Sequence, residues 1–183
     1  MPSNTPSLAT LLEAARFAAD RHVGQRRKGA SGRPYINHPI EVAETVARVG
    51  GITDVAVLCA ALLHDTVEDT DTTPEEIESR FGREVAALVA EMTDEKGLRS
   101  DVRKRLQVEN APHKSHGARA IKIADKTSNV REIGLDPPAD WSEERRRAYF
   151  TWAAEVIDAL RGQHPALEAL FDETLATSRM KLG

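Results

Sequence analysis

This sequence has little cysteine, no long apolar run and no recognisable export signal. Each of these absences argues against a class of protein. Cys59 is the only cysteine among 183 residues, so neither a disulfide framework nor a cysteine metal cage can form within the chain. There is no run of about 18 uncharged apolar residues, which a membrane-spanning helix would need. The first residues lack a basic segment followed by a long apolar stretch, so we expect no export signal. We therefore expect a protein of the reducing cytoplasm, without membrane association.

An excess of one charge is also missing. The 25 Lys and Arg residues face 29 Asp and Glu residues, for a formal net charge of −4. Charges of both signs are interspersed, which is typical of a soluble globular protein and argues against a nucleic-acid partner. The length falls within the range of one ordinary domain, and we predict a single domain over residues 1–183.

Apolar residues recur at spacings of three and four along most of the chain, as at Leu8, Leu11, Leu12 and Ala15, which predicts an all-α fold. The clearest helix start is the segment 73–76, Thr-Pro-Glu-Glu, which offers a capping threonine, a proline suited to the first turn and a glutamate three residues after the cap. Further helices are predicted over 83–92, 100–111, 115–133, 142–160 and 165–177.

Four ionisable side chains end a helix that is otherwise apolar. His64, Asp65, Glu68 and Asp69 follow the apolar run 55–63. If helical geometry continues, His64 and Glu68 form one row and Asp65 and Asp69 the adjacent row, so the acidic groups converge. Burying three carboxylates without a cation is costly, and a bound divalent metal would compensate. A solvated helix end is the alternative, because a His-Asp pair alone is too short to be specific.

Two distant segments carry residues that could complete such a site. The segment 34–39, Pro-Tyr-Ile-Asn-His-Pro, places His38 at the mouth of a helix whose first turn suits Pro39. In the segment 121–129, Asp125 and Asn129 share a helical face beside apolar neighbours. These segments supply a histidine, a carboxylate and an amide.

The order His38, His64-Asp65, Asp125 resembles that of the HD phosphohydrolase superfamily, in which two histidines and two aspartates bind the metal. Further segments resemble the hydrolase half of RelA/SpoT proteins, namely 24–28, 34–39, 60–70, 103–107 and 124–126. They are most similar to the small alarmone hydrolases, which are the metazoan SpoT homologues and their bacterial relatives. The similarity is strongest over residues 11–160. It implies a single HD-domain helical bundle with a mononuclear metal site.

The resemblance also implies roles for individual residues. Metal ligation falls to His38, His64, Asp65 and Asp125, and the catalytic acidic pair to Glu68 and Asp69. Substrate contacts fall to Arg27, Lys28, Asn129, Arg145 and Tyr149, for each of which a solvated charge or a half-buried ring is the alternative. Mn²⁺ is the metal that the family implies, whereas the ligand set alone would also permit Fe²⁺, Co²⁺ or Zn²⁺.

The implied reaction is metal-dependent hydrolysis of the 3′-pyrophosphate of ppGpp or pppGpp, which releases pyrophosphate and GDP or GTP. The expected partner is thus a guanine nucleotide alarmone. One alternative is a phosphatase acting on the 2′-phosphate of NADPH or on another nucleotide. A second is a nucleotide-sensing module on an inactive HD scaffold, although no expected ligand or acidic residue is missing. Oligomerisation is possible, but no amphipathic seam argues for it.

Some residues near these motifs are left out of the predicted site. Ser100 stands where animal members of the family carry a lysine, so substrate affinity or preference could differ. The basic run 103–105 could face phosphates, but an exposed helix face with paired charges fits its spacing equally well. Trp141 and Trp152 flank Tyr149, and we assign both to the core.

Overall fold

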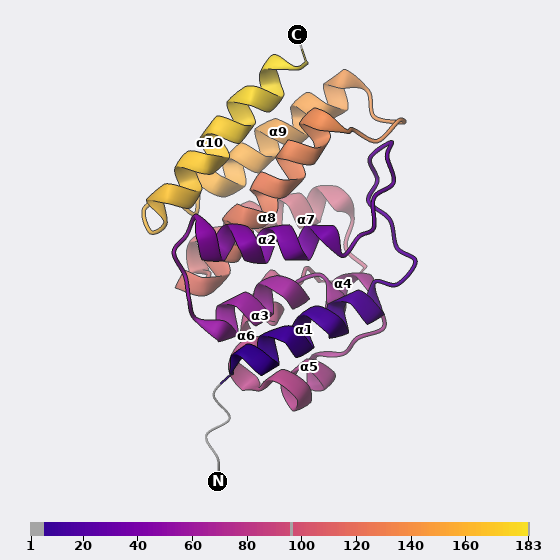
Figure 1. Ribbon diagram of the computed structural model, residues 1–183. Helices are drawn as coiled ribbons and strands as arrows, with labels where there is room; N and C mark the ends of the chain where they lie inside the picture. The colour runs from indigo at the N-terminus through magenta and orange to yellow at the C-terminus, as the bar shows by residue number, and fades with distance from the viewer. Residues whose placement is uncertain (1–5, 96, 183) are drawn as a thin grey trace.

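The computed structural model describes residues 6–95 and 97–182, and within those ranges the regular secondary structure is helical, apart from an isolated antiparallel bridge between Arg26 and Pro34. The predicted all-α class is confirmed (Figure 1). The helices are α1 (Leu8–Arg21), α2 (Asn37–Arg48), α3 (Val55–Leu63), α4 (Thr66–Asp69), α5 (Pro74–Phe81), α6 (Arg83–Met92), α7 (Ser100–Asn110), the short 3₁₀ turn η1 (Ala111–His113), α8 (His116–Leu135), α9 (Glu143–Asp158) and α10 (Pro165–Met180). In the described part of the chain, none of these helices has both the length and the apolar character needed to cross a bilayer.

The start of α5 follows the sequence signal closely. The Thr73 hydroxyl accepts the Glu76 N–H at 3.2 Å, and Pro74 occupies the first turn. The Glu76 carboxylate is drawn into a tertiary contact, because Arg21 of α1 donates to it at 2.5 Å. The local signal therefore locates the start of α5, and Glu76 links α5 to α1.

Helix α3 lies at the centre of the fold. All of its residues except Val55 and Leu58 are buried, and α1, α2, α6 and α8 pack around it (Figure 1). Asp54 caps its first turn by accepting the Ala56 N–H at 2.8 Å. A helix that is apolar on every face is stable only when it is covered on every face, so α3 anchors the core and holds the residues that follow it.

Helix α8 is the second buried rod, with α2 packed against it on one face and α10 on another. Figure 1 shows α8, α9 and α10 running together as one layer at the top of the view. Gly134 permits the close approach of α10, because a Cβ there would lie 2.4 Å from Ser178 Oγ. The final helix thus supports the element that carries Asp125.

The segment between α1 and α2 folds as a hairpin-like loop and docks on the end of α8. The Ser31 hydroxyl donates to Asp136 Oδ2 at 2.5 Å, and the Ser31 N–H is 3.2 Å from both carboxylate oxygens. A Cβ at Gly29 would lie 2.4 Å from Asp136 Oδ2, so the close approach requires glycine. This docking brings the basic residues 26–28 over the functional face of α8.

Candidate functional site

The polar residues after α3 lie at a break between two helices. α3 ends at Leu63 and α4 begins at Thr66, so the continuous helical rows considered from the sequence do not form. His64 Nδ1 lies 2.8 Å from Ala61 O, and the Thr66 hydroxyl donates to Leu63 O at 2.7 Å. These contacts satisfy carbonyls that the end of a helix would otherwise leave without partners. The break is therefore stabilised by the side chains of the motif itself.

Four side chains from three elements converge beside this break. Asp65 Oδ2 lies 3.2 Å from His64 Nε2 and 3.6 Å from His38 Nε2. Asp125 Oδ1, from α8, lies 3.3 Å from His38 Nε2 and 3.9 Å from His64 Nε2. Ligand atoms at such separations can share a single ion at the bond lengths of about 2.0–2.2 Å that nitrogen and oxygen ligands make. His38, His64 and Asp65 form a cluster that could hold a metal ion, and Asp125 faces the same point.

The hydrogen bonds of His64 indicate that the site fits a cation. His64 Nε2 is buried and makes no hydrogen bond within the described residues, even though Asp65 is close. Because Nδ1 of the ring donates to Ala61 O, the other nitrogen is the one available as a ligand. A buried nitrogen without a partner, aimed at two carboxylates, is the arrangement that a metal ion would satisfy.

A chain of polar contacts orients His38. The Ser128 hydroxyl donates to Glu41 Oε2 at 2.8 Å, so its oxygen is left to accept from His38 Nδ1 at 3.1 Å. Arg131 Nη1 in turn donates to Glu41 Oε1 at 2.5 Å. This chain places the proton of His38 on Nδ1 and leaves Nε2 facing Asp65 and Asp125. Glu41, Ser128 and Arg131 were absent from the predicted site, because no local motif links residues so distant in sequence.

Electrostatics keep both aspartates ionised in the metal-free protein. Burial alone would raise the pKa of Asp65, but His64 and His38 outweigh it and hold that pKa well below its ordinary value. Burial opposes ionisation of Asp125 in the same way, and Lys126, His38 and Lys122 lower its pKa.

Burial would also lower the pKa of His64, yet the two carboxylates raise it to about 9. The resulting positive charge on His64 offsets the carboxylates, and a metal ion would have to displace its proton.

The acidic residues Glu68 and Asp69 lie next to the cluster in different surroundings. Glu68 is half-buried and accepts from the Asp94 N–H at 3.3 Å and from Arg103 Nη1 at 3.1 Å. Burial and the nearby charge of Asp94 raise the pKa of Glu68, which suits a group that accepts a proton. Asp69 is exposed and lies 3.0 Å from the Tyr35 hydroxyl, whose single proton can also go to Asp65 Oδ2 at 2.7 Å.

A cavity of about 480 Å³ joins these groups to the predicted substrate residues. Its lining includes all of the residues predicted for metal, catalysis and substrate except His64, namely Arg27, Lys28, His38, Asp65, Glu68, Asp69, Asp125, Asn129, Arg145 and Tyr149. The side chains come from the loop before α2, the first turn of α2, the break after α3, the short helix α4, and helices α8 and α9. The cavity has a size typical of small-molecule sites.

The predicted substrate residues differ in how firmly they are held. Arg27 is mostly buried, pairs with Glu132, and donates to Asn129 Oδ1 at 2.7 Å. Asn129 Nδ2 donates to Asp125 Oδ1 at 2.6 Å, so the amide links the basic loop to the aspartate. Arg145 is exposed and stacks over the ring of Trp141, 4.4 Å from its centroid. Lys28 is exposed at the rim.

Several residues that line the cavity were left out of the predicted site. The assignment of Trp141 and Trp152 to the core is incomplete, because both are only half-buried and line the cavity while packing on the core. Arg103 contacts Glu68, so an exposed helix face is the wrong description of that residue. A salt bridge at 3.4 Å does pair Arg105, from the same run, with Glu109 on the exposed face. Ser100 lines the cavity as well.

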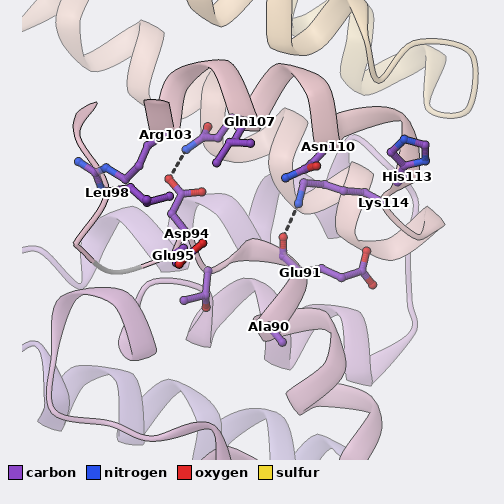
Figure 2. A pocket seen from close by; sticks show the side chains of 12 residues that line it. Ala90, Glu91, Asp94, Glu95, Leu98, Arg103, Gln107, Asn110, His113 and Lys114 are labelled. Atoms are coloured by element: carbon purple, nitrogen blue, oxygen red, sulfur yellow. Dashed lines mark hydrogen bonds between the residues drawn. The ribbon is translucent and has the colours of Figure 1, made fainter. Parts of the chain in front are cut away.

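A neighbouring cavity of about 390 Å³ lies between the end of α6, α7 and η1 (Figure 2). Asp94, Arg103 and Gln107 line both cavities, and Gln107 Nε2 donates to Asp94 Oδ2 at 2.6 Å. On its far side Lys114 donates to the backbone carbonyl of Glu91, and burial lowers the pKa of Lys114 to about 8. The Asp94–Gln107 bond thus lies between this cavity and the one that holds the clustered ligands.

Comparisons with known proteins match this arrangement. The HD domain family matches residues 14–153. The chain is 56% identical over 160 residues to guanosine-3′,5′-bis(diphosphate) 3′-pyrophosphohydrolase MESH1 of Homo sapiens, covering 87% of this chain and 89% of that protein. It is 50% identical over 179 residues to MESH1 of Danio rerio, covering 98% of this chain and 99% of that protein.

Two solved structures resemble the whole architecture. One, reported as a metazoan ortholog of SpoT that hydrolyzes ppGpp, superposes with a TM-score of 0.90 at 47% identity, covering 93% of this chain and 96% of that one. The other, lmo0812 from Listeria monocytogenes EGD-e, gives a TM-score of 0.67 at 29% identity and covers 83% of this chain and 99% of that one.

Proposed function

This chain belongs to the HD domain family, and on that basis we propose that it is a metal-dependent hydrolase of the 3′-pyrophosphate of ppGpp and pppGpp, releasing pyrophosphate and GDP or GTP. One observation carries the proposal. His38, two aspartates and the acidic residues Glu68 and Asp69 line one cavity, and His64 contacts Asp65 directly behind that lining. The relatives and structures named for this reaction on ppGpp support the choice of substrate.

His38, His64, Asp65 and Asp125 would hold the metal, and we call this group the metal end of the cavity. A divalent ion there would lower the pKa of a bound water and polarise a phosphoryl oxygen. We propose Mn²⁺, because it is the metal that the family resemblance implies; the two imidazoles and two carboxylates by themselves suit Fe²⁺, Co²⁺ or Zn²⁺ as well. Metal analysis of protein purified without added metal distinguishes these ions.

Glu68 is the proposed proton acceptor. Arg103 and the Asp94 N–H orient its carboxylate, while its raised pKa increases its basicity. The oxygen of the attacking water bonds to the phosphorus attached to O3′ and passes its proton to Glu68. The bond from that phosphorus to O3′ breaks, and O3′ is protonated as it leaves. Asp69 assists by orienting the water, and Tyr35 holds its carboxylate.

The nucleotide would bind among Arg27, Lys28, Asn129, Arg145 and Tyr149, which we call the nucleotide end of the cavity. Arg145 already stacks on Trp141, and such a pair can receive a purine ring by stacking. Arg27 and Lys28 would neutralise phosphate charge.

We place the protein in the cytoplasm. Cys59 is a buried free thiol, which suits a reducing compartment. The net charge of the protein, −4, disfavours a nucleic-acid partner.

To test this function, purified protein is incubated with ppGpp and, separately, with NADPH. Each reaction is run once with added Mn²⁺ and once with a chelator, and the released pyrophosphate and phosphate are measured. Metal-dependent release of pyrophosphate from ppGpp is the expected result. If phosphate is released from NADPH and no pyrophosphate is released from ppGpp, the metal site would stand and the substrate would be NADPH instead. Failure to act on either nucleotide would favour a sensing module.

A further inference from the structure

Helix α8 carries two lysines, Lys122 and Lys126, that line the main cavity and have no role in the proposed reaction so far. They stand one helical turn apart, and each is only 4% exposed. Lysine is seldom buried to this extent unless its charge has a partner.

The partners of these two ammonium groups are unequal. Lys126 Nζ lies 3.5 Å from Asp125 Oδ2 and 4.4 Å from the centroid of the Trp152 ring, so an ion pair and a cation–π contact compensate its burial. Among the described residues, Lys122 takes part in no hydrogen bond or ion pair, and the carboxylates of Asp125 and Asp94 attract it only from a distance. An ammonium group buried beside a cavity without a partner indicates an anion that arrives from solvent.

The position of the two lysines relative to the metal end indicates which anion they take. Oδ1 of Asp125 faces His38 and accepts from Asn129, whereas Oδ2 of the same carboxylate faces Lys126. Asn129 is in turn bound to Arg27, at the nucleotide end. Along the axis of α8, Asp125 therefore lies between Asn129 and Lys122, and the rise of about 1.5 Å per residue separates Lys122 from Asn129 by roughly 10 Å. Lys126 follows Asp125 in sequence, and its ammonium group lies at Oδ2 of that carboxylate, whereas Asn129 donates to Oδ1.

The substrate has the same linear order. In a nucleoside 3′-diphosphate, the reacting phosphorus stands between the ribose and the terminal phosphate. With the nucleoside at the Asn129 side and the reacting phosphorus beside Asp125, the terminal phosphate reaches the side of Lys126 and Lys122. Ammonium groups suit this role, since each offers a full charge and three donors to phosphate oxygens.

We propose that Lys122 and Lys126 form a subsite that binds the terminal phosphate of the 3′-diphosphate and then holds the pyrophosphate product. The inference rests on the proposed function, and it assigns the two diphosphate groups of the substrate to different parts of the cavity. The 5′-diphosphate lies with the nucleoside, and the lysine pair takes the 3′ group.

The experiment compares binding of two probes, inorganic pyrophosphate and GDP, to full-length protein by titration calorimetry with saturating Mn²⁺. Lys122→Met and Lys126→Met are the test variants. Loss of a charged contact should weaken pyrophosphate binding by about 10- to 100-fold in Lys122→Met, while GDP binding stays within about threefold. Lys114→Met is the matched control, because it removes a partly buried lysine that lines only the neighbouring cavity, and it should leave both affinities unchanged.

Two outcomes would overturn the subsite. Pyrophosphate affinity in Lys122→Met could stay within threefold of wild type, or GDP affinity could fall as much as that of pyrophosphate, which would place the 5′-diphosphate at the lysines. Thermal melts check folding, which should survive because an apolar replacement removes an uncompensated buried charge, and Lys122→Gln serves as a second variant. Binding needs no turnover, so wild-type protein that binds pyrophosphate through these lysines but fails to hydrolyse ppGpp would refute only the proposed function.

Discussion

His38 and His64, at the metal end of the cavity, are each 3% exposed, whereas Lys28 and Arg145, at the nucleotide end, are exposed. The histidine rings are fixed by Ser128 and by the Ala61 carbonyl. The two basic side chains extend from a loop and from the first turn of α9, and Arg145 has a distant ion pair with Asp140 at 3.7 Å.

The difference reflects what water does to charge. Burying a charge without compensation is costly, so the side chains at the metal end are fixed by hydrogen bonds and ion pairs, and small changes there should alter the chemistry. An exposed charge is screened and mobile, so it contributes affinity more than rate. Substitutions at the two ends should therefore differ in kind, and four of them test this, from the largest expected effect to the smallest.

Asp65→Asn should give the largest loss. The amide cannot replace the charge that faces both histidines, so metal affinity should fall by more than the roughly 100-fold typical of outer partners of a ligand, and hydrolysis should fall with it. Metal content after dialysis and the hydrolysis rate measure the two effects. Asp71→Asn, on an exposed turn, is the control. Full metal content together with wild-type activity in Asp65→Asn would remove this aspartate from the site.

Glu68→Gln should leave metal binding intact and reduce kcat by about 10²- to 10⁴-fold, as loss of a proton acceptor does. Gln keeps the shape and can still accept from Arg103, so the change isolates the basicity of the carboxylate. Steady-state kinetics and metal content are the measurements, with Glu95→Gln, an exposed residue at the neighbouring cavity, as control. A kcat within tenfold of wild type would shift the role to Asp69.

Ser128→Ala should act through His38 and have a smaller effect. Without the hydroxyl, the imidazole loses the acceptor for its Nδ1 proton, and metal affinity should decrease by about 10- to 100-fold. Competition with a metal chelator measures the affinity. Ser178→Ala removes a comparably buried serine from α10 and should leave metal affinity unchanged. Equal metal affinity in the two variants would mean that the Glu41–Ser128 chain has no influence on the metal end.

Arg145→Ala should have the smallest effect and a different signature. Loss of the exposed guanidinium on Trp141 should raise KM for ppGpp by about tenfold with kcat nearly constant, which is the pattern of uniform binding. The effect should shrink in high salt, because exposed charges are screened. Arg161→Ala, which lies outside the cavity lining, controls for general charge. A large decrease in kcat would show that the nucleotide end contributes to the chemical step.

Individual residues show how far prediction from sequence reaches. Thr73 and Pro74 mark the start of α5 correctly, because a helix cap depends on neighbours within one turn. His38, His64, Asp65 and Asp125 are close together as expected, since the resemblance carries their spatial relation with it. The unbroken helix considered after Leu63 does not form, because the side chains of His64 and Thr66 satisfy the helix end in place of further backbone turns.

By itself, the sequence determined the helical class, the main helix ends and the candidate ligands, all of which depend on local spacing or on contiguous motifs. Only the tertiary structure decided that Ser128 and Glu41 orient His38, that Arg103 faces Glu68, and that Lys122 is buried without a partner. The physical reason is that these relations join helices distant along the chain. Their strength depends on burial, which arises only when the helices pack together.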